Sequence, residues 1–267
     1  MLKSAFNDYI FTPLYNALVY LIDVVPGGDV GVAVIVLTIG VKIILIPLSL
    51  KAARTQVIMR ELEEPLKAIQ AKYKDKKDLE SRQQQSAEIM GLYREKGVNP
   101  FSSILLLFIQ LPIIFGLYWV FFRGALPEVD PSLLYAFVRV PDVVTMEFLG
   151  WVDVAERSLV LALLAGATQY YQTKLAFPKP KPRDPETASF SDDLARSMHV
   201  QMRYVLPVVV VVFAYIISAA VALYWTTSNI VSILQEWHVR RTIRRPAEER
   251  AKQAEADKSA SEPTAKK

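Results

Sequence analysis

Long apolar runs separated by polar, charged segments make up most of this chain. One such run, residues 30–51, reads VGVAVIVLTIGVKIILIPLSLK and contains a single charged residue before its end, Lys42. From residue 30 to residue 50 an α-helix would extend roughly 31 Å at about 1.5 Å per residue. A bilayer core is about 30 Å thick, so this run predicts a membrane-spanning helix.

The same alternation predicts the organisation of the whole chain. Residues 204–235 carry no charge, and as one helix they would run roughly 48 Å, too long for a bilayer without steep tilt. We therefore divide them near Ser218. Apolar residues spaced by three and four within residues 4–25 predict an amphipathic helix along the membrane surface, with an imperfect extra span as the alternative. The predicted segments are an interfacial helix and turn (1–29), five spans (30–51, 100–123, 158–173, 204–218 and 219–238), a cytoplasmic helical hairpin (52–99), an extracytoplasmic loop (124–157), a cytoplasmic loop (174–203) and a basic, disordered tail (239–267).

The distribution of positive residues predicts the orientation. With the N-terminus outside, the exterior segments contain few cations, namely Lys3, Arg123, Arg139 and Arg157, whereas the hairpin, the 174–203 loop and the tail contain most of the others. Cytoplasmic loops of membrane proteins carry an excess of Lys and Arg. We therefore predict an all-α integral membrane protein with five transmembrane helices, the N-terminus outside and the C-terminus inside.

Composition supports a membrane protein and excludes some chemistry. The chain is 52% hydrophobic with a mean hydropathy of +0.23, which is high for a soluble domain. It contains no cysteine, so it has neither a disulfide framework nor a thiolate metal site. The two histidines, His199 and His238, are far apart in sequence and predict no metal cluster. We expect no cofactor and no catalytic centre.

Lys42 is the candidate functional residue. A charge near the bilayer centre costs about 2.5–3.5 kcal/mol on insertion scales, so its presence indicates a use. The apolar runs 30–51, 101–122, 158–173 and 204–235 contain no Asp or Glu. An ion pair between spans is therefore not expected, and Lys42 has no evident protein partner. Polar residues elsewhere in the spans predict a wet recess around it, although singly they would serve helix packing or an interfacial aromatic belt. The predicted lining residues are Gln110, Gln169, Tyr170, Tyr224, Trp225, Thr226 and Asn229, with Thr227 and Ser228 beside them.

Three stretches carry a resemblance to a known family. They are PGGDVGVAVIVLTIGVKIILIPLSLKAAR, KGVNPFSSILLLFIQLPIIFGLYWVF and ALYWTTSNIVSILQ. They resemble the YidC/Oxa family of membrane-protein insertases, and the resemblance extends from residue 4 to about residue 241. It implies a positive residue in the first core span, facing a hydrophilic groove open to cytoplasm and lipid. That residue is usually Arg, and here Lys42 takes its place without the bidentate guanidinium fork. Gln169 and Trp225, and less directly Gln110 and Tyr224, fall where groove-lining residues are expected.

The chain also departs from the family pattern. The turn before the last span is Ile217-Ser218-Ala219-Ala220 rather than Pro-Gly, and the large extracytoplasmic domain of Gram-negative versions has no counterpart, so the chain resembles the minimal form. The resemblance implies a multi-pass protein of the bacterial cytoplasmic (inner) membrane that transfers client segments into the bilayer. Its partners would be nascent membrane proteins, the ribosome, the Sec translocon and membrane lipids. The alternatives are a small anion channel or transporter, with Lys42 as its selectivity charge, and a structural assembly scaffold.

Overall fold

The computed structural model describes residues 6–74, 76, 78–99, 112–116, 118–120, 126–176, 196–247, 249–250 and 253. The chain divides into two compact units. Unit 1 comprises Met1–Leu45 and Gln110–Glu236, and unit 2 comprises Ile46–Ile109 and Trp237–Lys267.

The described residues are mostly helical, as the apolar pattern predicts, with one short pair of strands that the sequence analysis did not predict. Two of their helical stretches, Val30–Met59 and Arg196–Ile217, are long and apolar enough to cross a membrane. The elements are a π-helical turn Asn7–Phe11, α2 (Thr12–Val24), a 3-10 turn Pro26–Gly28, α3 (Val30–Glu61), α4 (Glu63–Lys72), α5 (Leu79–Glu95), a 3-10 turn Pro131–Leu133, β1 (Glu147–Phe148), β2 (Val152–Asp153), α7 (Leu159–Ala176), a π-helical turn Gln201–Val205, α9 (Leu206–Ile217), α10 (Ala219–Val239) and a π-helical turn Arg240–Arg244, with residues 112–116, 118–120 and 196–200 also helical.

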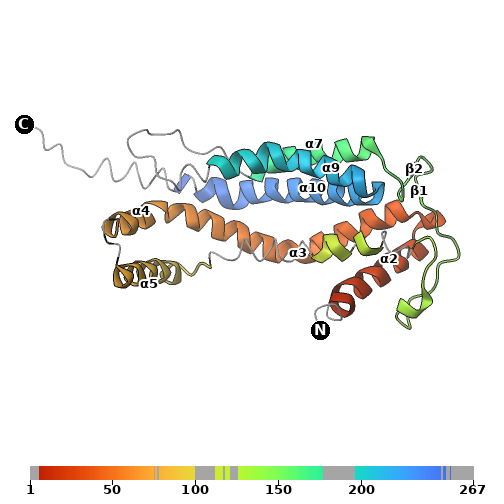
Figure 1. The fold of residues 1–267 in the computed structure, drawn as a ribbon, viewed down its shortest axis with the longest axis horizontal. Coiled ribbons are helices and arrows are strands. Elements are labelled where there is room, and N and C mark those ends of the chain that lie inside the picture. Colours follow the sequence, from red (N-terminus) through yellow and green to blue (C-terminus); the bar gives the residue numbers. More distant parts are fainter. Residues whose placement is uncertain are drawn as a thin grey trace, which may run out of the picture. The chain divides into compact units, whose positions relative to one another are not determined.

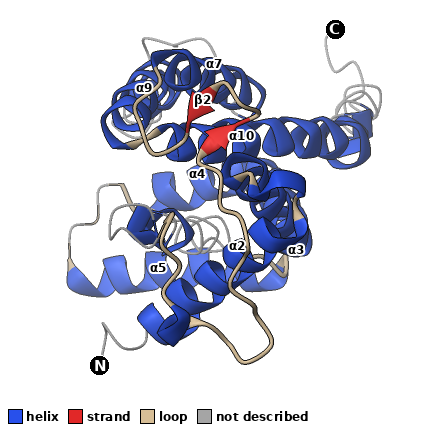
Figure 2. Cartoon of the chain, turned by 90° about the vertical axis from the view of Figure 1, so that its right-hand side faces the viewer, coloured by secondary structure: helices blue, strands red, loops and turns tan. Residues whose placement is uncertain are grey.

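Within unit 1, α10 lies between α3 and the pair α7 and α9 (Figures 1 and 2). α7 and α9 approach closely because Gly166 has no side chain. A Cβ at this position would overlap the Val211 side chain and come within 3.2 Å of the Pro207 carbonyl oxygen. Small residues allow such close approach between helices in membranes.

α2 contributes one apolar face to the core of unit 1. Tyr15, Leu18, Val19 and Ile22 are at most 1% exposed, at the three- and four-residue spacing that the sequence analysis reads as amphipathic. Tyr20, on the opposite side, is exposed. The two faces therefore separate as the pattern predicts, while the position of α2 along a membrane surface stays a prediction.

The segment 126–157 is fastened to the N-terminal region by side chains of α2. The Asn16 side-chain amide donates to the Leu133 carbonyl (2.8 Å), and its oxygen accepts from the Tyr135 amide (2.7 Å). The Asp130 amide donates to the Tyr15 hydroxyl (2.9 Å). The segment also forms the antiparallel pair β1–β2, visible in Figure 2, in which Glu147 pairs with Asp153.

A helix break at Ser218 separates α9 from α10. Ser218 is extended (φ −172°, ψ 164°), although neither Pro nor Gly is present there. The amides of Ala219 and Ala220 donate to the carbonyls of Glu156 (2.7 Å) and Val154 (2.9 Å). Because the first amides of a helix have no partner within it, these contacts cap α10 from the 126–157 segment.

Unit 2 contains the polar hairpin. α4 and α5 are joined across the hairpin by Lys72 and Glu88, whose charged groups lie 2.9 Å apart. Asp78 caps α5 by accepting from the Ser81 amide at 2.8 Å. Pro65 is the third residue of α4, where proline is tolerated because the first turn needs no internal donor.

The helices extend beyond the predicted spans. α3 continues ten residues past Lys51, and the chain leading into α9 is already helical at residues 196–203, before the predicted start at 204. The predicted disorder of the tail is wrong for its first part, because residues 239–247 are helical. There Val239 is buried, and Arg244 Nη2 donates to Gln56 Oε1 at 3.2 Å, which holds the turn against the end of α3. Residues 177–195 of the predicted cytoplasmic loop lie outside the described residues.

Candidate functional site

Lys42 lies on the face of α3 directed toward α10. It is half-buried, whereas its neighbours Ile43 and Ile44 are 56% and 77% exposed. Successive residues on a helix are separated by about 100°, so the two isoleucines project from another side of α3. The lysine therefore points into unit 1, and the apolar side chains after it cover the outer surface.

The Lys42 ammonium has a neutral partner. Its Nζ donates to Ser232 Oγ at 3.0 Å, and Ser232 Oγ in turn donates to the Ser228 carbonyl at 2.8 Å. This corrects the expectation that Lys42 has no protein partner. Among the described residues, no Asp or Glu forms an ion pair with Lys42, and that includes Glu236, which follows Ser232 by one turn within the predicted fifth span. The lysine is held by a serine, and no acidic side chain in the described part of the chain compensates its charge.

A row of polar residues on α10 leads to this contact. Tyr224, Ser228 and Ser232 are spaced by four, so they share one helix face. Tyr224 is 3% exposed and Ser228 5% exposed, and their side chains are hydrogen-bonded to each other. Tyr224 is among the residues that the sequence predicts for the recess, Ser228 only as its neighbour, and Ser232 is not among them. The spacing of four from Ser228 was the signal that could have found Ser232.

Two other predicted residues, Asn229 and Gln169, have hydrogen-bond partners away from Lys42. Asn229 faces α7, where its amide donates to the Ala165 carbonyl and to Thr168 Oγ1, both at 3.3 Å. The Gln169 amide bonds within α7, to Thr173 Oγ1 at 3.2 Å. Both residues are buried, and their contacts join or stiffen helices rather than line the surroundings of the ammonium.

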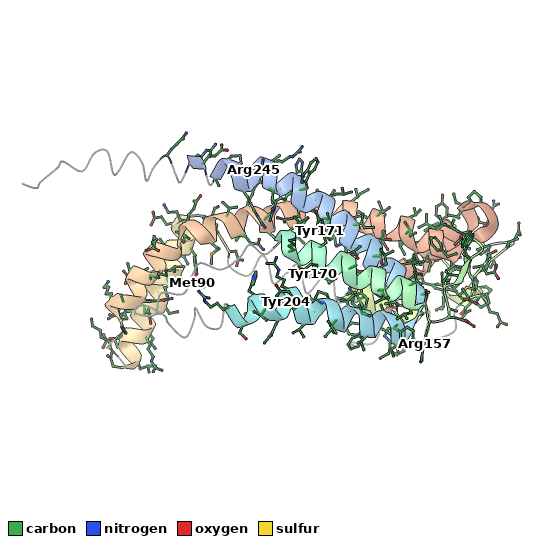
Figure 3. The ribbon with its side chains drawn as sticks, turned by 90° about the horizontal axis from the view of Figure 1, so that it is seen from above. Met90, Arg157, Tyr170, Tyr171, Tyr204 and Arg245 are labelled. Carbon is green, nitrogen blue, oxygen red and sulfur yellow. The ribbon has the colours of Figure 1, made fainter. Side chains whose placement is uncertain are left out.

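Three further predicted residues differ in their surroundings. Tyr170 is 37% exposed, and the centroid of its ring lies 6.2 Å from that of Tyr204. Figure 3 labels both residues. Trp225 is half-buried against the core of unit 1. Thr226 is buried, and its hydroxyl has no hydrogen-bond partner among the described residues. Gln110 lies outside the described residues.

The structure also buries a cation that the sequence analysis did not single out. Arg203, 8% exposed, lies with its Nη1 3.4 Å from His199 Nε2 and its guanidinium 6.0 Å from the Tyr204 ring centroid. These residues precede α9. Arg203 is stabilised by a neighbouring aromatic ring and imidazole, which distinguishes it from Lys42.

An apolar cavity lies nearer the N-terminal ends of α3 and α10. Its volume is about 20 Å³, and it is lined by Val34, Ile114, Tyr118, Ile217, Ala220, Val221 and Tyr224. Val34 precedes Lys42 by eight residues, roughly 12 Å along a helix. Tyr224 therefore connects the cavity with the surroundings of Lys42. Its side chain lines the cavity, and its hydroxyl is hydrogen-bonded to Ser228, one turn before Ser232.

Comparison with known proteins identifies the family. A family model described as the 60Kd inner membrane protein matches residues 21–247. A membrane protein insertase YidC of Clostridium tetani is 34% identical over 210 residues, which cover 79% of this chain and 81% of that protein. This chain belongs to the YidC/Oxa family.

Other YidC proteins match over most of this chain but differ in their own length. One from Fusobacterium nucleatum is 30% identical over 237 residues, covering 87% of this chain and 97% of that protein. One from Neisseria meningitidis is 31% identical over 235 residues, covering 87% of this chain but 36% of that protein. The chain thus spans about a third of the longer relative and between 81% and 97% of the two shorter ones. Its family and its apolar helices make it a membrane protein.

Proposed function

We propose that this chain is a membrane protein insertase of the bacterial cytoplasmic membrane, crossing it five times with the N-terminus outside and the C-terminus inside. It would transfer client transmembrane segments and short extracytoplasmic tails from the cytoplasm into the bilayer through a hydrophilic groove that carries Lys42. Its relatives from Clostridium tetani and Fusobacterium nucleatum carry the name membrane protein insertase. The contact between Lys42 and Ser232 is the observation on which the proposed mechanism rests.

The serine is a replaceable partner. A hydroxyl hydrogen bond positions the ammonium but leaves its charge uncompensated, whereas a carboxylate both accepts the hydrogen bond and compensates the charge. Two opposite charges 4 Å apart attract by roughly 4 kcal/mol at an effective dielectric constant near 20. An acidic residue in a client's tail would therefore displace Ser232 and be held transiently, without a catalytic step.

The energy for transfer would come from the client. Burial of its apolar surface in lipid gives about 25 cal/mol per Å². The membrane potential adds about 2.3 kcal/mol per charge per 100 mV and pulls an acidic tail outward. The polar hairpin α4–α5 would receive the client on the cytoplasmic side, where the ribosome and the Sec translocon are the expected partners.

Depletion of the native insertase and rescue by Lys42 variants tests the charge-capture step. Lys42→Met keeps the length of the side chain and removes the charge, and Lys42→Glu reverses it. We expect both to slow the insertion of clients with acidic tails, roughly tenfold for each ~1.4 kcal/mol of lost attraction. Lys42→Arg should rescue. Matched clients with neutralised tails control for general damage, since their insertion should change little.

Ser232→Ala supplies a second control. It removes the resting partner but keeps the ammonium, so we expect insertion of acidic-tailed clients to be retained. If Lys42→Met and Lys42→Glu insert acidic-tailed clients as fast as the parent does, the charge-capture mechanism is wrong. Selective anion conduction by the purified protein without client, abolished in Lys42→Met, would instead support the channel alternative.

Cysteine labelling tests the proposed orientation. The parent chain contains no cysteine, so a single introduced thiol gives an unambiguous signal. Ser86 of α5 and Ala155 of the 126–157 segment are both exposed. A membrane-impermeant maleimide added to intact cells should label Ala155→Cys and spare Ser86→Cys until the membrane is opened. The reverse pattern would contradict the orientation.

A further inference from the structure

An aromatic–cation pair stands at the end of α10, in unit 2. The Arg241 guanidinium carbon lies 3.4 Å from the centroid of the Trp237 ring, which is a stacking distance for a cation–π contact. Trp237 is 54% exposed, and Arg241 is also exposed. Stacking occupies one flat face of the guanidinium and leaves its N–H groups, which lie in the plane, available to an anion.

The four arginines of this region are not equivalent. Arg244 is 7% exposed and bonds Gln56, so its role is to hold the helical turn in place. Arg240 is half-buried, whereas Arg241 and Arg245 are exposed; Figure 3 marks Arg245 at this end of the ribbon. Among the described residues, no Asp or Glu forms an ion pair with Arg241. Only part of the basic cluster is therefore free to bind an external anion.

The order of residues along the helix indicates what that anion is. Leu234, 62% exposed, precedes Trp237 by one turn, and Arg241 follows Trp237 by one turn. An exposed aliphatic residue, then tryptophan, then arginine matches the order of hydrocarbon, interface and headgroup in a bilayer, because tryptophan prefers the interface. Arginine binds phosphate oxygens with two parallel hydrogen bonds.

We propose that Trp237, Arg241 and Arg245 form a binding site for the phosphate group of anionic phospholipids in the cytoplasmic leaflet. The inference rests on the proposed orientation with the C-terminus inside, but it needs no client and no Lys42. Each cation near an anionic membrane surface contributes about 1 kcal/mol, which corresponds to about fivefold in binding. The aliphatic and aromatic residues next to the arginines favour lipid over RNA, whose phosphates the same arginines would otherwise suit.

Quenching of Trp237 fluorescence by brominated lipid tests the site. A variant with Trp119, Trp151 and Trp225 changed to Phe is reconstituted into two kinds of phosphatidylcholine vesicle that contain the same fraction of phosphatidylglycerol. In one kind the bromine is on phosphatidylglycerol, and in the other it is on an equal amount of phosphatidylcholine, so the surface charge is identical. Should the triple variant fail to fold, the difference between the parent and Trp237→Phe gives the same signal.

We expect stronger quenching when the anionic lipid carries the bromine. Arg241→Gln should reduce the preference for the anionic lipid about fivefold, and added salt should weaken it. Arg250→Gln, an exposed charge farther along the tail, removes the same charge and should leave the preference intact.

Three results would overturn the proposal. One is equal quenching in the two kinds of vesicle, and another is an Arg250→Gln effect as large as that of Arg241→Gln, which would indicate diffuse attraction. The third is a change in Trp237 fluorescence on addition of polyuridylic acid that is lost in Arg241→Gln, observed together with equal quenching by the two lipids. That result would assign the site to RNA. A failure of insertion in Lys42 variants would leave these measurements unchanged, so the two proposals fail separately.

Discussion

Removal of the Asp29 carboxylate should loosen the junction between α3 and the 126–157 segment. Asp29 is 9% exposed, and its two oxygens accept from different amides, Val32 at 3.0 Å and Leu149 at 2.8 Å. The first contact caps α3, and replacement of an N-cap by Ala costs about 1 kcal/mol. The second is a hydrogen bond to a charged group, which contributes about 1.5–3 kcal/mol. Asp29→Ala should therefore destabilise unit 1 by about 2.5–4 kcal/mol.

Denaturant titration in detergent micelles, followed by tryptophan emission, measures this free energy. Asp153→Ala is the matched control, because the Asp153 side chain is exposed and, among the described residues, accepts only from the nearby Ala155 amide. Its loss should cost less than about 1 kcal/mol. Asp29→Asn retains one acceptor oxygen and should fall between the two. Equal stability of Asp29→Ala and the Asp153→Ala control would refute the assignment of Asp29 as the link between the two segments.

Further predictions follow from helix packing and from two sets of hydrogen bonds. Gly166→Ala should destabilise the packing of α7 on α9 by about 1–3 kcal/mol, because a Cβ at this position meets the Val211 side chain. Gly91→Ala, on the open surface of α5, should instead stabilise its helix by up to about 1 kcal/mol. Chemical unfolding of the two variants measures both changes. Asn229→Ala should cost about 0.6–1.7 kcal/mol in the same assay because it removes the hydrogen bonds to α7. The hydrogen bond from Lys72 lowers the pKa of Glu88 below its ordinary value near 4.5. The stability that the ionised carboxylate adds to the hairpin is therefore fully present above pH 4.5 and is lost as the pH falls through the lowered pKa. Corrected amide-exchange protection of α4 and α5 should decline over that acidic range in the parent, and this part of the decline should be absent in Glu88→Gln.

The site shows where prediction from sequence reached its limit. The sequence identified Lys42 because a charge inside an apolar run is conspicuous without any knowledge of neighbours. The sequence also placed Tyr224 and Asn229 on the last helix. It did not show which neighbouring helix each of the two side chains faces. Periodicity gives the angle between residues around one axis, whereas the rotation of that axis against the next helix depends on packing. That rotation directs Ser232 toward Lys42 and Asn229 toward α7.

The sequence by itself determined the mostly helical class, the apolar helices, the polar hairpin and the family, because these depend on local composition, period and motif. Only the tertiary structure decided the partners of polar groups. The helix break at Ser218 is stabilised by carbonyls more than sixty residues earlier in the chain. Of four adjacent arginines, it buries Arg244 and exposes Arg241. Hydrogen bonds and burial between distant segments depend on how helices pack in three dimensions, and no pattern along one segment specifies that packing.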